Sequence, residues 1–104
     1  MTLNPAERHR TSEELLDNLA RSGLELHDVA ADLGRTRERL RGTLDVDPAS
    51  DPGDVWQLRD YLRQAVLDAG GAPTPYTVLT DRSRGMARVW FRLRKAPRHV
   101  LVTP

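Results

Sequence analysis

The residues of this sequence best suited to chemistry are its arginines, four of which alternate with other residues between positions 35 and 41. Arg37 and Arg41 are four residues apart, which places them on one face of a helix. Arginine can donate to the O6 and N7 atoms of guanine or to phosphate oxygens. We therefore expect Thr36, Arg37 and Arg41 to be DNA-contacting residues near the start of a recognition helix. In the alternative interpretation, these arginines form a solvated face paired with Glu38 and an acidic first helix.

A second basic group lies near the C-terminus. Residues 71–104 contain seven Arg and Lys residues and one acidic residue, whereas residues 1–70 contain nine Arg and 14 Asp and Glu. These charges sum to plus six and minus five. Arginines beside a tryptophan can meet phosphate charge and a base or sugar face, so we expect a phosphate grip formed by Arg88, Trp90, Arg92 and Arg94. The alternative is that this segment pairs with the acidic half of its own fold or of a second copy.

Catalytic, metal and nucleotide chemistry find no support in the sequence. It contains no Cys, hence no thiolate and no disulfide. His9, His27 and His99 are far apart and lack metal-ligand spacing, and the acidic residues between 45 and 54 lack the ligands and the glycine of a calcium loop. Neither a nucleophile elbow nor a phosphate-binding loop occurs. We therefore expect a non-enzymatic protein without a metal, a cofactor or a small-molecule ligand.

Two capping patterns indicate where the first helix begins. Asn4 precedes Pro5 and lies three residues before Glu7, which is typical of a capping box with proline at the first helical position. Thr11 opens a second such pattern, so the ordered helix begins at one of the two. Gly23 supplies its left-handed stop.

Residues 26–44 predict two short helices joined by a glycine turn, as a helix-turn-helix (HTH) unit requires. Gly34 makes the turn, and Thr36 caps the second helix. Gly42 within that helix costs about 1 kcal/mol relative to alanine. The apolar positions that would form the core of the unit are Leu26, Val29, Ala30, Leu33, Leu40 and Leu44.

A turn-rich segment over residues 46–53 precedes a fourth helix, which we expect to begin at Asp54 and to end before Gly70. Trp56 and Tyr61 lie outside its main apolar stripe, so the helix has a wide apolar surface. This surface either packs against the first helix or the C-terminal segment, or it forms a homodimer interface. The stripe itself consists of Val55, Leu58, Leu62, Ala65, Val66 and Ala69.

The C-terminal part of the chain predicts a β-hairpin. Residues 76–80 are rich in aromatic and β-branched side chains, and Val89, Phe91 and Leu93 alternate with polar residues and Trp90. Residues 86–94 also fit a helix, and periodicity alone does not decide between the two. We favour the hairpin because a strand over residues 76–80 would otherwise have no partner.

Several segments together resemble one family. They are residues 11–15, 22–24, 30–34, 58–62, 69–71, 75–77 and 90–91. On these segments the chain resembles a family of small, uncharacterised bacterial proteins with a helix-turn-helix-like domain of unknown function. The resemblance implies an HTH-like fold and brings no catalytic residues with it.

The length and composition of the chain predict a single small domain. The chain has 104 residues, of which 38% are hydrophobic and 30% charged, as in one small globular domain. It has no apolar run of membrane-spanning length, and its first twenty residues are charged, so we expect a cytoplasmic protein. We expect one mainly helical (α+β) domain over residues 1–104, with an HTH-like bundle of four helices in residues 1–70 and a basic β-hairpin and tail in residues 71–104.

Two functions are compatible with this fold. The first is a DNA-binding or regulatory protein that contacts double-stranded DNA, with a homodimer suited to paired half-sites. The second is a non-enzymatic protein-interaction or structural module whose HTH-like unit does not contact DNA.

Overall fold

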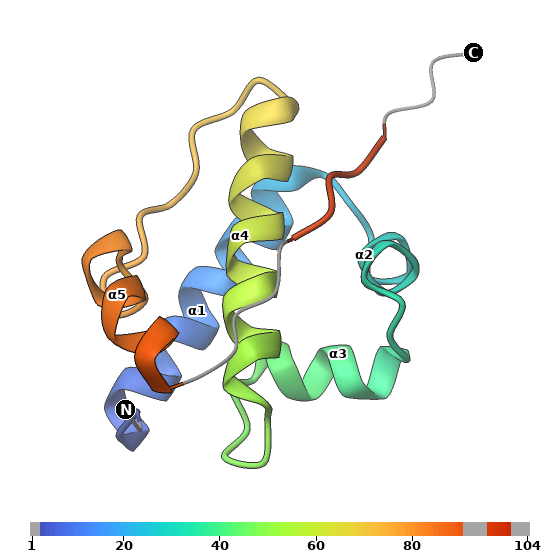
Figure 1. Ribbon diagram of the computed structural model, residues 1–104. Helices are drawn as coiled ribbons and strands as arrows, with labels where there is room; N and C mark the ends of the chain where they lie inside the picture. The colour runs from blue at the N-terminus through green and yellow to red at the C-terminus, as the bar shows by residue number, and fades with distance from the viewer. Residues whose placement is uncertain (1–2, 91–95, 101–104) are drawn as a thin grey trace.

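Helices dominate the computed structural model, which describes residues 3–90 and 96–100. In Figure 1, α4 stands near the centre, with α2 and α3 on one side of it and α5 on the other. No helix in these ranges is long and apolar enough to cross a membrane. The helices are α1 (Pro5–Ser22), α2 (Leu26–Leu33), α3 (Arg37–Leu44), α4 (Pro52–Asp68) and α5 (Asp81–Trp90).

Helix α1 begins at the first of its two predicted starts. The Asn4 side chain accepts from the Glu7 backbone N–H at 2.8 Å, and the Glu7 carboxylate accepts from the Asn4 backbone N–H at 3.0 Å. This reciprocal pair satisfies two N–H groups that the helix start would leave without partners. The helix ends at Gly23, whose φ of 72° lies in the left-handed region.

Helix α4 begins earlier than predicted. Asp51 is its N-cap and accepts from the Gly53 backbone N–H at 2.8 Å, and Pro52 occupies the first helical position. The expected start at Asp54 is therefore wrong by about one turn, because proline at the first position needs no backbone donor. Asp54 instead lies in the first turn of the helix and is buried.

The wide apolar surface of α4 is covered within the chain. All residues from 53 to 59 are buried, and Trp56 and Tyr61 are only 3% and 1% exposed. The first two turns of α4 are thus buried on every side, which places this end of the helix at the centre of the fold. The core that surrounds it includes Leu15 of α1, Val29 of α2 and Leu40 of α3. Trp56 is consequently not available as a homodimer contact in this structure.

The predicted β-hairpin is wrong. Residues 81–90 form α5, and no strand is present within residues 3–90 or 96–100. Thr80 starts the helix, because its side-chain oxygen and its carbonyl both accept from the Ser83 backbone N–H at 3.1 Å. Residues 71–80 run as an irregular segment that leads into it.

Side chains take the place of the strand partner that residues 76–80 were expected to need. The Thr77 backbone N–H and hydroxyl donate to the buried Glu14 carboxylate at 3.1 and 2.8 Å. The Leu79 carbonyl accepts from Arg59 Nε at 3.0 Å, and the Val78 carbonyl accepts from Ser83 Oγ at 3.1 Å. Because these backbone groups already have partners, the segment does not depend on a sheet.

Candidate nucleic-acid interface

Helices α2 and α3 are joined by a tight three-residue turn over residues 34–36. Gly34 has a φ of 64°, and the Arg35 backbone N–H donates to the Ala30 carbonyl at 2.9 Å, which closes the end of α2. Figure 1 shows α2 nearly end-on while α3 lies across the view, so the two helices cross steeply. Leu40 and Leu44, both predicted to point inward, are buried and hold α3 against the core.

A buried carboxylate fixes α3 to α4. Arg35 Nη1 lies 2.9 Å from Asp54 Oδ1, and Arg39 Nε and Nη2 lie 3.0 and 2.8 Å from Oδ2. The side chain of Asp54 is 3% exposed and that of Arg35 is 7% exposed. The Arg35 guanidinium also donates to Gln57 Oε1. Such a paired and hydrogen-bonded charge is tolerated in a core, whereas an unpaired one is not.

This arrangement divides the four arginines of residues 35–41 into two kinds. Arg35 and Arg39 serve the fold through Asp54, which the sequence interpretation missed because it placed Asp54 at a helix start. Arg37 and Arg41 are exposed, and within residues 3–90 and 96–100 neither forms an ion pair. The predicted pairing of these arginines with Glu38 is therefore absent from the described contacts.

Thr36 has a structural role in addition to any role in binding. It is the N-cap of α3, and its Oγ1 accepts from the Arg39 backbone N–H at 3.1 Å. The residue is exposed and directly precedes the exposed Arg37. The structure thus brings Thr36, Arg37 and Arg41 together on one exposed part of α3.

The second predicted contact group is not assembled as expected. Arg88 and Trp90 belong to α5, where positions two apart are separated by about 200° around the axis instead of sharing one face of a strand. Their side chains, like Arg92 and Arg94 as a whole, lie outside what the structure describes. The proposed grouping on the face of a hairpin is therefore wrong.

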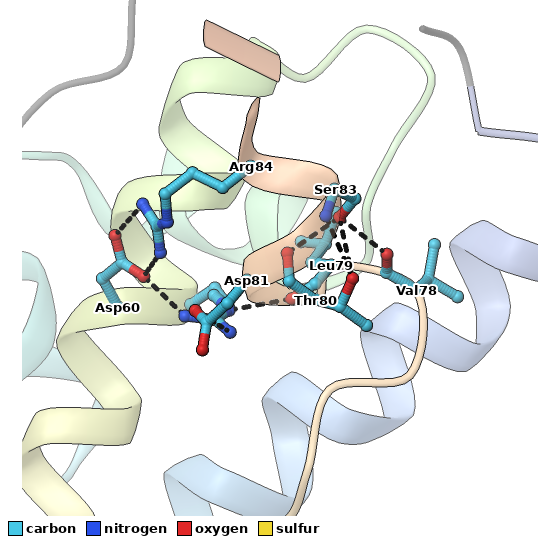
Figure 2. Close-up of polar contacts among 8 residues, drawn as sticks. Asp60, Val78, Leu79, Thr80, Asp81, Ser83 and Arg84 are labelled. Carbon is cyan, nitrogen blue, oxygen red and sulfur yellow. Dashed lines mark hydrogen bonds and ion pairs between the residues drawn. The ribbon is translucent and has the colours of Figure 1, made fainter. Parts of the chain in front are cut away.

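Two basic residues on either side of positions 88–94, Arg84 and Arg98, form ion pairs with carboxylates of α4. Arg84 Nη2 and Nη1 lie 2.5 and 3.0 Å from the two carboxylate oxygens of Asp60 on α4 (Figure 2). This bond raises the pKa of Arg84. Arg98 Nη2 lies 2.7 Å from Asp68 Oδ1 and lowers the pKa of that carboxyl. Pairing of the basic segment with the acidic half of the same chain, one of the two predicted alternatives, is thus observed for these two residues.

Arg59 completes the attachment of α5 to α4. It is 5% exposed, its Nη1 lies 2.8 Å from Asp60 Oδ1, and its Nη2 lies 3.3 Å from Asp81 Oδ1. The guanidinium also lies over the ring of Tyr76, 5.0 Å from its centroid. In Figure 2, Arg84 reaches across to Asp60 from α5, so one carboxylate of α4 binds arginines of both helices.

A third polar cluster joins the C-terminal segment to α2 and α4. Tyr61 donates to Asp32 Oδ2 at 2.5 Å, and His99 Nδ1 lies 2.6 Å from the same oxygen. Burial and the hydrogen bond to Asp32 raise the pKa of the Tyr61 hydroxyl. The sequence held no sign of this cluster, because residues 32 and 99 are remote along the chain. Within the described ranges, no group of three or more His, Cys, Asp or Glu residues is placed to hold a metal ion.

Comparison with known proteins places the chain in a family. A family model described as "uncharacterized protein conserved in bacteria (DUF2316)" matches residues 1–92. No curated protein and no solved structure gives a significant match. The predicted resemblance to an uncharacterised bacterial family is confirmed by this match, and the chain belongs to that family.

Proposed function

We propose that the chain is a cytoplasmic, non-enzymatic DNA-binding protein with a regulatory role, in which α2, the turn and α3 act as a helix-turn-helix unit. Thr36, Arg37 and Arg41 would face the major groove of double-stranded DNA. One observation carries the proposal: two arginines of α3 and its preceding turn are fixed to the core by Asp54, while the other two are exposed and form no ion pair within the described residues.

Fixation of α3 supports this role physically. A recognition helix must present its side chains in a defined position, because base edges are read through hydrogen bonds of narrow geometry. Leu40 packs α3 from below, and Asp54 binds residues on either side of position 37. The helix therefore does not need to order itself at the moment of binding, which lowers the entropic cost of association.

Charge limits the affinity that this unit can supply by itself. Residues 1–70 carry an excess of five negative charges. Each neutralised phosphate contributes about 0.9 to the salt slope of binding. Arg37 and Arg41 can therefore contribute at most about −2 to the slope, the value reached if both neutralise a phosphate, which is well below that of strongly basic DNA-binding proteins.

A protein-interaction module is the second candidate function. It is favoured by Arg84 and Arg98, because both pair with carboxylates of α4, so their charges are compensated within the chain, whereas a phosphate grip requires guanidinium groups without such partners. In that case the exposed arginines of α3 would bind an acidic protein surface. Association into a homodimer stays a prediction under either function, with a contact that does not include the buried Trp56.

The decisive experiment compares two double variants on a randomised duplex pool. Arg37→Ala/Arg41→Ala removes the exposed α3 arginines, whereas Arg10→Ala/Arg63→Ala removes two exposed arginines from α1 and α4. We expect wild type and the control to retain the same enriched sequences, and the α3 variant to lose that preference. The proposal fails if the α3 variant enriches the same sequences as wild type, or if wild type retains no duplex at low salt.

A further inference from the structure

A hollow of about 230 Å³ lies between the N-terminal end of α1, the loop that joins α3 to α4, and the residues before α5. An apolar cavity of about 150 Å³ is large enough for benzene, and pockets for drug-sized ligands begin at about 300 Å³. The hollow is therefore suited to a single ring or a short chain with one small substituent. Its apolar wall includes Leu3, Val46, Pro48, Val55, Trp56 and Leu79.

Arg8 supplies a positive charge at this apolar wall. Its Nη1 donates to the Leu3 carbonyl at 3.0 Å, and within the described residues no carboxylate pairs with it. A guanidinium has five N–H donors, so Arg8 keeps donors for a further acceptor. Its planar fork matches a carboxylate, which it can bind through two parallel hydrogen bonds.

Asp47 is the negative charge on the same wall. It is exposed, and its Oδ1 accepts from the Ala49 backbone N–H at 2.9 Å within the loop. The carboxylate of Asp47 would repel a bound anion and weaken its affinity. It therefore offers a control of opposite sign to Arg8.

The wall also contains Val46, the one non-glycine residue with a positive φ among the residues that the structure describes. Val46 has a φ of 49°, which β-branched residues rarely adopt. Conformations of this kind concentrate at ligand sites and switch regions, where the surrounding structure maintains them. Ser50 Oγ donates to the Gly42 carbonyl at 3.0 Å, so the loop that carries Val46 is bonded directly to α3.

We propose that this hollow binds a small apolar carboxylate, with its ring or chain against Val55 and Trp56 and its carboxylate on Arg8. The proposal goes beyond the DNA-binding function and does not depend on it. The sequence predicted no small-molecule ligand, because the wall is assembled from residues between positions 3 and 79 that meet only in the fold. Contact between the loop and α3 connects this site to the α3 surface.

Ligand titrations of the full chain test the proposal. The probes are benzoate and hexanoate, with benzamide and hexan-1-ol as their neutral counterparts. Binding is followed by amide chemical shifts and by the fluorescence of Trp56 in a Trp90→Phe background, since the chain has two tryptophans. We expect saturable binding of at least one carboxylate with a dissociation constant of about 1 mM or lower, in line with so few heavy atoms. The matching neutral probe should bind about tenfold more weakly.

Single substitutions then assign the site. Arg8→Gln should weaken carboxylate binding about tenfold, as expected for the loss of a charge-assisted hydrogen bond. Arg10→Gln, at an exposed position on the same helix, should have no effect. Asp47→Asn should strengthen binding, and Leu3→Phe should weaken both charged and neutral probes by filling the hollow.

Three results would overturn the proposal. The first is that neither carboxylate binds saturably, and the second is that the neutral probes bind as tightly as their carboxylates. The third is that the Arg8→Gln and Arg10→Gln variants bind the carboxylate probe with equal affinity. If Arg8→Gln does not fold, the comparison of charged with neutral probes in the wild type and the effect of Asp47→Asn decide the question.

Discussion

Replacement of Asp54 by asparagine tests how α3 is held in place. The substitution keeps the size of the side chain and removes the negative charge that faces Arg35 and Arg39. Removal of one partner from a buried ion pair typically costs about 3–5 kcal/mol, because the other charge is left uncompensated. Of the two arginines, Arg35 has a buried side chain, which is 7% exposed. The side chain of Arg39 is 52% exposed, so its charge can be solvated by water once Asp54 is replaced.

The expected loss lies below that range. The introduced asparagine would still accept a hydrogen bond through its side-chain oxygen, and Gln57 still accepts from the Arg35 guanidinium. We therefore expect Asp54→Asn to lower the free energy of unfolding by about 2–3 kcal/mol. For a domain of this size, the melting temperature would fall by about 10–20 °C.

Urea denaturation followed by circular dichroism at about 222 nm gives the free energy directly. Asp45→Asn is the matched control, because Asp45 is an exposed carboxylate at the C-terminal end of α3, and its replacement should change stability by less than about 0.5 kcal/mol. A double-mutant cycle with Arg35→Met isolates the interaction between Asp54 and Arg35. The double variant should lose less free energy of unfolding than the sum of the losses in the two single variants. Equal stability of Asp54→Asn and Asp45→Asn would refute the proposed anchoring of α3.

Three further predictions concern residues of α4 and of the segments that contact it. Trp56→Ala should lower stability by about 3–5 kcal/mol without changing the sedimentation coefficient of the folded protein, because Trp56 is covered within its own chain; a change in association state with unchanged stability would contradict this. Burial raises the pKa of Tyr76 to about 12 and also raises that of Tyr61, so ultraviolet absorbance should show no tyrosine ionisation near pH 10 in the folded protein. Since both pKa values are higher in the folded state than in the unfolded state, stability should decline as the pH rises above about 10. Arg98 lowers the pKa of the Asp68 carboxyl, so Arg98→Ala should move its NMR titration midpoint upward, and an unchanged midpoint would count against the contact.

Local chemistry determined the helix boundaries that were predicted correctly. Asn4 and Glu7 form their capping box across three residues, Gly23 and Gly34 end α1 and α2 in the left-handed conformation, and Thr36 caps α3. Each of these signals acts between residues that are close along the chain. Distant contacts in the folded protein therefore do not alter these signals, and the bounds of α2, the turn and α3 could be predicted from them.

Tertiary contacts decided the C-terminal third and the assignment of the arginines. Residues 76–80 have the composition of a strand, yet Glu14, sixty-three positions before Thr77, satisfies the backbone group that a sheet would have used. Similarly, sequence spacing does not distinguish Arg39 from Arg41, and only the position of Asp54 on α4 makes the first a structural residue. Burial and ion pairing depend on which distant residues the fold brings within a few ångströms. Composition and periodicity, which describe one segment at a time, do not contain that information.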